Sequence, residues 1–169
     1  MSLSESLLPE FDHEMANTRK TLERIPENAF NWKPHGISWT MAELSTHITN
    51  IPNWIGYTLA AEALDIMPGG VPAPRMTALN TRQEILTQFD KSVAGARQAL
   101  SGAADKQLLE SWSLLANGKV LFTMPRIAVM RTMIFSHIIH HRAQLGLYLR
   151  LNNIPVPSIY GPTADESGM

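Results

Sequence analysis

Residues 125–151, PRIAVMRTMIFSHIIHHRAQLGLYLRL, carry the clearest helical pattern in the chain. Apolar side chains and two histidines recur there at alternating intervals of three and four residues, which places them along one face of an α-helix. The members of this face are Ile127, Met130, Ile134, His137, His141, Leu145 and Tyr148. Pro125 suits the first helical position, because proline has no N–H and none is needed there. The pattern therefore predicts a helix from Pro125 to about Leu151 with two histidines on its inward face.

Three earlier segments show the same periodicity. They run from Ser4 to about Ile25, from Thr40 to about Leu64, and from about Thr81 to Leu100. Ser4 and Ser6 are candidate caps of the first. The second and third each begin with a threonine followed three residues later by a glutamate, the spacing of a capping box. Pro52 lies inside the second and should bend it, because its ring removes a backbone hydrogen bond.

The connections between these helices are rich in proline and glycine. Residues 26–39 predict an ordered loop, and residues 65–80 predict a long crossover. Residues 101–124 are ambiguous, since 107–115 fit either a short helix or an extended segment and Asn117-Gly118 is typical of a hairpin turn. We expect an all-α fold, a four-helix bundle with a long crossover connection and an irregular C-terminal tail, in a single domain of residues 1–169.

The composition narrows the classes of function. The 169 residues carry a formal net charge of -1, with 44% hydrophobic and 17% charged residues, and no segment resembles a membrane span or a signal peptide. This balance argues against nucleic-acid and membrane partners and predicts a cytoplasmic protein. Cysteine is absent. A metal ion would therefore have to be held by histidines and carboxylates.

Three histidines are candidate metal ligands. His137 and His141 lie four residues apart and so share one helix face, where they can direct two nitrogens at a single ion. His47, on a mostly apolar face of the second helix, can supply a third ligand. Such a site leaves coordination positions open, as catalytic sites do. The alternative is that these are hydrogen-bonded core histidines; His13 and His35 are weaker candidates, one on a helix surface and one in a loop.

The chain resembles the DinB/YfiT family of metal-dependent helical bundles. The resemblance is carried by TRKTLERIPENAFNWKPHGISWTMAELSTHI (18–48), HIIHHRAQLGLYLRL (137–151) and NNIPVPSIYGPTADE (152–166). It implies a metal triad of His47, His137 and His141, with His140 outside it. It further implies nickel or zinc as the ion, and activities such as thiol S-transfer, isomerisation or hydrolysis.

Other residues are candidates for a pocket around this triad. They are Asn50, Trp54, His140, Arg142 and Tyr160. Each has a simpler alternative role. Trp54 could be a core residue, and His140 could lie at the flank or on the surface. Arg142 could form an ordinary ion pair, and Tyr160 could simply pack the tail. Metal-bound imidazoles usually donate their second N–H to an acceptor, so we expect a carboxylate or a backbone carbonyl behind each histidine. Asp12, Glu14 and Asp90 are candidates for that role or for ordinary surface charges.

Three kinds of function remain open at this point. The first is a metal-dependent enzyme, of transferase or hydrolase type, that activates water or a low-molecular-weight thiol to attack a small-molecule substrate. The second is a noncatalytic bundle that binds a metal or another ligand. The third is an interaction protein that dimerises through its exposed helical surface. A homodimer is also compatible with the first two, because helical bundles often pair through their exposed faces.

Overall fold

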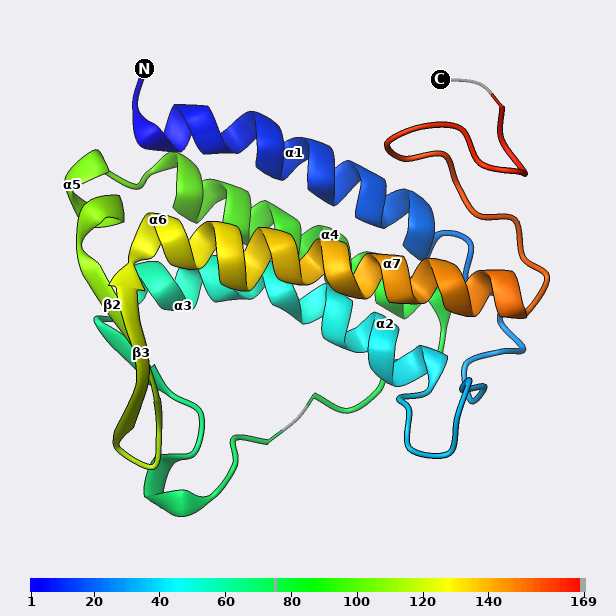
Figure 1. Ribbon diagram of the computed structural model, residues 1–169, viewed down its shortest axis with the longest axis horizontal. Coiled ribbons are helices and arrows are strands. Elements are labelled where there is room, and N and C mark those ends of the chain that lie inside the picture. Colours follow the sequence, from blue (N-terminus) through cyan, green and yellow to red (C-terminus); the bar gives the residue numbers. More distant parts are fainter. Residues whose placement is uncertain (75, 168–169) are drawn as a thin grey trace.

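Each of the four predicted helices is present in the computed structural model, which describes residues 1–74 and 76–167. Residue 75, in the predicted crossover, and residues 168–169, at the end of the predicted domain, lie outside this description. The helices are α1 (Leu3–Leu22), α2 (Met41–Asn50) with α3 (Trp54–Ala60), α4 (Arg82–Ser101), and α6 (Arg126–Val129) with α7 (Ser136–Leu151). Around the bundle, α1 packs on α4, α4 on α2, α2 on α7, and α7 on α1 (Figure 1).

Local sequence signals account for the starts of α1, α2 and α4. Thr40 and Thr81 cap α2 and α4 through the expected capping boxes. The cap of α1 is Ser2, which forms a capping box with Glu5, so the prediction of Ser4 or Ser6 was wrong by a few residues. Each box satisfies two backbone N–H groups at a helix start that otherwise have no partner.

The second predicted helix is interrupted at Pro52, as expected. A 3-10 turn over Ile51–Asn53 separates α2 from α3, because proline cannot donate the backbone hydrogen bond that an α-helix requires. The predicted end at Leu64 was wrong. The helix ends at Ala60, and Ala63–Asp65 forms strand β1 instead. The Asp65 carboxylate accepts hydrogen bonds from the backbone N–H groups of Asn117 and Gly118, which ties β1 to the hairpin.

A small sheet corrects the prediction of a strictly all-α fold. Strand β2 (Ser111–Ala116) pairs antiparallel with β3 (Lys119–Pro125) and parallel with β1, in the order β1-β2-β3. The turn between β2 and β3 is the predicted Asn117-Gly118 pair, whose φ angles of 52° and 74° match a tight hairpin turn. The short helix in this region is α5 (Asp105–Leu109), just before the sheet.

The last predicted helix is long but not uniform. A π-helical segment, Met130–Phe135, separates α6 from α7 and ends two residues before His137. Met130, Ile134 and Leu145 are completely buried, as the pattern predicted. Within the described part of the chain, none of the helices has both the length and the apolar character needed to cross a membrane.

Candidate metal centre

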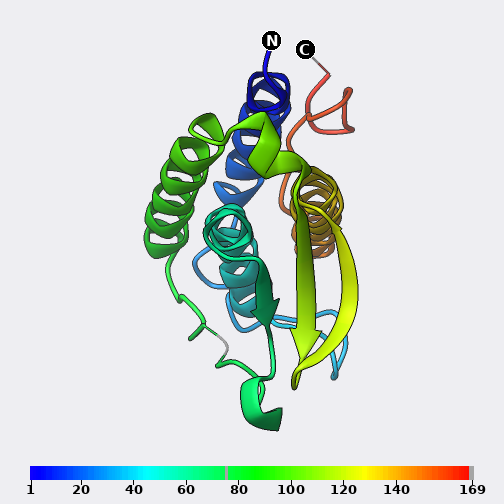
Figure 2. The same ribbon diagram turned by 90° about the vertical axis from the view of Figure 1, so that its left-hand side faces the viewer.

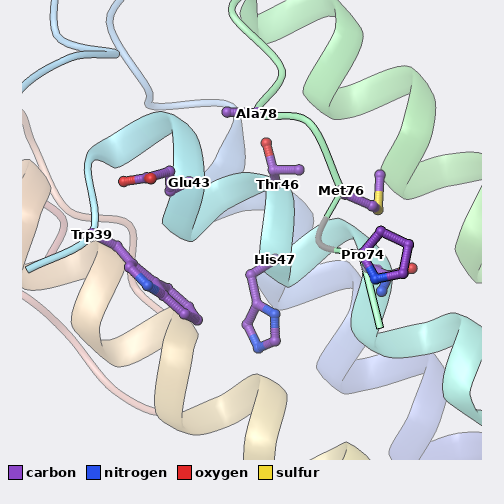
Figure 3. Close-up of a pocket in the computed structure, with 8 residues that line it drawn as sticks. Trp39, Glu43, Thr46, His47, Pro74, Met76 and Ala78 are labelled. Carbon is purple, nitrogen blue, oxygen red and sulfur yellow. The ribbon is translucent and has the colours of Figure 1, made fainter. Parts of the chain in front are cut away.

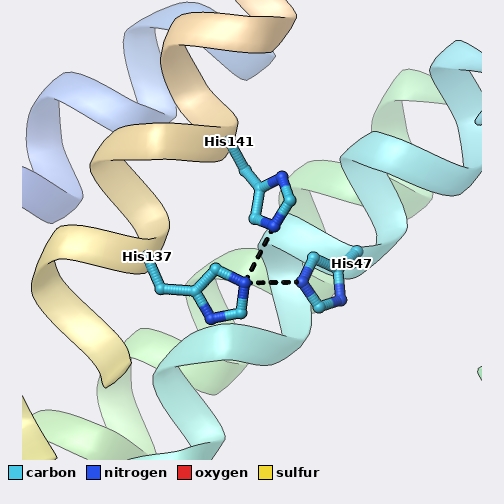
Figure 4. A group of neighbouring side chains, drawn as sticks. All are labelled: His47, His137 and His141. Carbon is cyan, nitrogen blue, oxygen red and sulfur yellow. Dashed lines mark hydrogen bonds between the residues drawn. The ribbon is translucent and has the colours of Figure 1, made fainter. Parts of the chain in front are cut away.

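Two packed helices bring the three predicted histidines together. His47 lies in the last turn of α2, while His137 and His141 lie one turn apart on α7. Because α2 packs against α7, the three imidazoles point into the space between the two helices (Figure 4). All three side chains are half-buried, which leaves one side of the cluster accessible.

The spacing of the ring nitrogens fits a shared ion. The Nε2 atom of His137 lies 3.2 Å from Nε2 of His47 and 2.8 Å from Nε2 of His141. A ligating nitrogen from each ring lies within 4.8 Å of those of the other two. Nitrogen ligands about 2.0 to 2.1 Å from zinc, at angles of roughly 90 to 109°, stand about 2.8 to 3.4 Å apart. The cluster could therefore hold a metal ion.

The hydrogen bond of the second ring nitrogen in each α7 histidine also favours a metal site. Nδ1 of His137 lies 3.3 Å from the backbone carbonyl of Met133, and Nδ1 of His141 lies 2.7 Å from the amide oxygen of Gln144. Oxygens of this kind only accept hydrogen bonds, so each neutral ring carries its proton on Nδ1. The two Nε2 atoms then face each other with lone pairs. That arrangement is repulsive for hydrogen-bonded core histidines and favourable around a cation.

Burial keeps the imidazoles of His137 and His141 neutral. Desolvation lowers the pKa of His141 from 6.5 to about 4, and it also lowers the pKa of His137. Aromatic rings enclose the cluster, with Trp39 stacked 5.8 Å from the His141 ring and Trp54 at 5.1 Å from the His137 ring. Neutral imidazole is the form that binds metal ions.

The depressed pKa gives a testable pH dependence. In metal-free protein the His141 imidazole should remain neutral down to about pH 4. Between about pH 6.5 and pH 4 the unfolded chain then binds more protons than the folded chain, so protonation of this residue lowers the stability as the pH falls through that window. NMR titration of the histidine Cε1–H signals measures this directly. The urea-unfolded chain, expected to titrate near 6.5, is the control; a folded-state midpoint near 6.5 would contradict the result.

Some predicted pocket residues join the cluster. Asn50 lines a cavity together with His47, and Trp54 packs against His137. His140 lies beside the cluster, its ring 4.9 Å from that of His141, but it is exposed. This placement matches its expected role as a flanking residue.

Arg142 and Tyr160 belong to a separate cluster on the face of α7 toward α1. The Arg142 guanidinium is buried and forms an ion pair with Glu14 at 2.7 Å. The Tyr160 hydroxyl donates a hydrogen bond to the same carboxylate and accepts one from Arg142. The two residues therefore fasten the C-terminal tail, and the prediction that they line the histidine pocket was wrong. Arg142 directly follows His141 in sequence, so its side chain points about 100° further around α7 than that of His141.

The residues behind the histidines differ from the predicted carboxylates. Asp12 pairs with Arg97, Asp90 with Arg19, and Glu14 with Arg142, all away from the cluster. Behind His137 the acceptor is the Met133 backbone carbonyl, which confirms the alternative of a carbonyl, and behind His141 it is the Gln144 side chain, while Trp39 covers the His141 ring. Gln144 had a usable signal, because it lies three residues after His141 on one helix. No comparable signal marks Trp39, which comes from a loop.

A cavity of about 410 Å³ opens beside His47 (Figure 3). It is bounded by α2, by Trp39 and by the crossover segment. The backbone N–H of Leu79 donates a hydrogen bond to Thr46 Oγ1 at 2.8 Å, which fixes the crossover against the helix. Its lining residues are Trp39, Glu43, Thr46, His47, Asn50, Pro74, Met76 and Ala78. The volume lies within the usual range for small-molecule sites.

Comparisons with known proteins agree with this architecture. The model of the DinB superfamily matches residues 10–145, a range that includes all three histidines. A crystal structure of a DinB-like protein from Bacillus cereus superposes with a TM-score of 0.69 at 22% identity, covering 92% of this chain and 97% of that one. A DinB-like protein from Bacillus subtilis also gives 0.69, at 16% identity, covering 91% and 97%. No curated protein matches the chain.

Proposed function

The chain belongs to the DinB superfamily, and we propose that it is a metal-dependent enzyme. His47, His137 and His141 would hold a divalent ion, nickel or zinc, which suit imidazole ligands. The reaction would be the attack of water or a low-molecular-weight thiol on a small-molecule electrophile. The observation that carries this proposal is the convergence of three half-buried Nε2 atoms next to a cavity large enough for a substrate.

The number and type of ligands support a reactive site over a purely structural one. Structural zinc sites are usually closed by four protein ligands, whereas catalytic sites use three and keep a position open. When bound, such an ion lowers the pKa of a coordinated water or thiol and so supplies a nucleophile at neutral pH. Because the chain has no cysteine, a thiol would have to come from a cosubstrate.

The chain's own residues would bind and orient the substrate. Asn53 donates a hydrogen bond at 3.1 Å to the side-chain oxygen of Asn50, which leaves the Asn50 NH₂ group as the donor toward the cavity. Trp39 and Trp54 exclude water from two sides of the histidines. In thiol transfer, the sulfur forms a bond to the electrophilic carbon, the leaving group departs with its electron pair, and the thiol proton passes to solvent.

An activity screen with and without metal tests the proposal. Protein loaded with zinc or with nickel should accelerate either thiol addition to electrophiles or ester hydrolysis, and a chelator should remove that activity. Dependence of the rate on thiol concentration separates transferase from hydrolase. If the loaded protein accelerates neither reaction, and chelation instead lowers the melting temperature strongly, the noncatalytic alternative of a structural ion is favoured.

The proposal also includes a cytoplasmic location and a homodimer, without nucleic-acid or membrane partners. Exposed apolar side chains on α7, including Leu147 at 58% and Leu151 at 54% exposure, are consistent with a partner helix. Light scattering on the purified protein measures the mass directly, and a mass of 18.8 kDa would argue for a monomer.

A further inference from the structure

A second cavity, of about 210 Å³, lies between the sheet, α3 and the π-helical segment. The strands that contribute to its lining extend from one end of the bundle (Figure 2). Its walls include Trp54 and Tyr57 of α3, Leu64 of β1, Trp112 of β2, Phe122 of β3 and Met133 of the π-helical segment. None of the described side chains that line it is charged.

The size and lining of this cavity favour an apolar guest. Protein interiors rarely leave voids larger than a water molecule, and a dry apolar cavity of about 150 Å³ is known to bind benzene. At the mouth, Tyr57, Leu64 and Ile66 are 51%, 38% and 39% exposed. Large apolar side chains gathered around an opening are typical of ligand-binding sites. A charged guest would lose its hydration and would find no opposite charge among the described lining residues.

One polar group within the walls lacks a partner. The indole Nε1 of Trp112 is buried and has no acceptor, the one side chain of this kind among the residues described. Leaving a buried donor unsatisfied is costly. A guest that carries a single acceptor within reach of this N–H would remove this cost.

Two residues of this cavity also contact the histidine cluster. The Trp54 ring lies 5.1 Å from the His137 ring, and the Met133 carbonyl lies 3.3 Å from His137 Nδ1. The apolar cavity and the candidate metal centre therefore share a wall. A molecule with a polar reactive part and an apolar part could use both spaces.

We infer that this cavity is the binding site for an uncharged aromatic group of the substrate, one bearing at most a single hydrogen-bond acceptor. The inference rests on the proposed function for the link to a reaction. The binding of the aromatic group itself requires no metal. The substrate class is thus an aromatic electrophile rather than a small polar one.

Binding of 2-naphthol to the metal-free protein tests the cavity. We expect saturable binding in NMR titrations, with the largest shifts at the Trp54 and Trp112 indole signals. Leu114→Trp, a half-buried cavity residue on β2, should fill the space and weaken binding roughly tenfold or more. Leu121→Trp, the same change at a 52% exposed position on β3, is the matched control and should bind as the wild type does.

The outcomes separate this inference from the proposed function. No saturable binding, shifts confined to other residues, or equal binding by Leu114→Trp and the wild type would each overturn the inference. If Leu114→Trp fails to fold, Leu64→Trp at the mouth of the cavity replaces it. Failure of the protein to bind either zinc or nickel would overturn the metal-dependent reaction and leave the naphthol result standing.

A kinetic arm then tests the substrate class in the zinc-loaded enzyme. Leu114→Trp should raise KM for benzyl bromide, an aromatic electrophile without a strong hydrogen-bond acceptor, roughly tenfold or more and leave KM for iodoacetamide unchanged. Equal effects on the two electrophiles would contradict an aromatic subsite, even if the enzyme is active.

Discussion

Replacing His141 by alanine should abolish stoichiometric zinc binding, whereas replacing its neighbour His140 should leave binding intact. His141 supplies one of three converging nitrogens, and its loss leaves two ligands, which rarely hold an ion. Losing a residue that only supports a ligand typically costs about 10- to 100-fold in affinity, so losing a ligand should cost more than about 100-fold. Competition titration against a chromogenic chelator, on protein without a histidine tag, measures both affinities.

The control removes an imidazole of the same kind from the adjacent position. His140 is exposed, and its ring stands beside His141 without joining the three ligands. Wild-type protein and His140→Ala should therefore bind one zinc ion per chain. Equal weakening by the two substitutions would mean that zinc binds at a surface site, and unchanged binding in His141→Ala would refute the triad.

The histidine triad was predictable because helix geometry fixes it. A four-residue interval places His137 and His141 on one face whatever the rest of the chain does. The apolar neighbours of His47 likewise place it toward the core. The partners of longer side chains are set by the packing of distant segments. Arg142 illustrates this, since its partners Glu14 and Tyr160 lie on α1 and in the tail.

The fold shows the same division between local and distant causes. Capping boxes, the break at Pro52 and the Asn117-Gly118 turn depend on a few adjacent residues, and the sequence predicts them. Strand β1 has only three residues and exists through its pairing with β2, so no alternating pattern marks it. The π-helical segment Met130–Phe135 continues an apolar helical pattern and has no local signal either.

Replacing Arg142 by methionine should lower the free energy of unfolding by about 3 to 5 kcal/mol. The Arg142 side chain is 3% exposed and the Glu14 side chain 8% exposed. Removing the guanidinium leaves a buried carboxylate without its counter-charge, and only the Tyr160 hydroxyl remains to donate to it among the contacts described. Urea unfolding of the metal-free protein measures the loss. At roughly 2 to 4 °C per kcal/mol for a chain of this size, the melting temperature should fall by about 10 °C.

Two further variants identify the buried charge as the cause. Arg97→Met breaks the exposed ion pair with Asp12, so it should cost no more than about 1 kcal/mol. Adding Glu14→Gln to Arg142→Met removes the unpaired charge and should restore much of the lost stability. No recovery in the double variant would mean that packing of the arginine stem causes the loss. Because Arg142 faces α1 while the triad faces α2, Arg142→Met should retain zinc binding while folded; loss of zinc would show that the ion pair also positions α7.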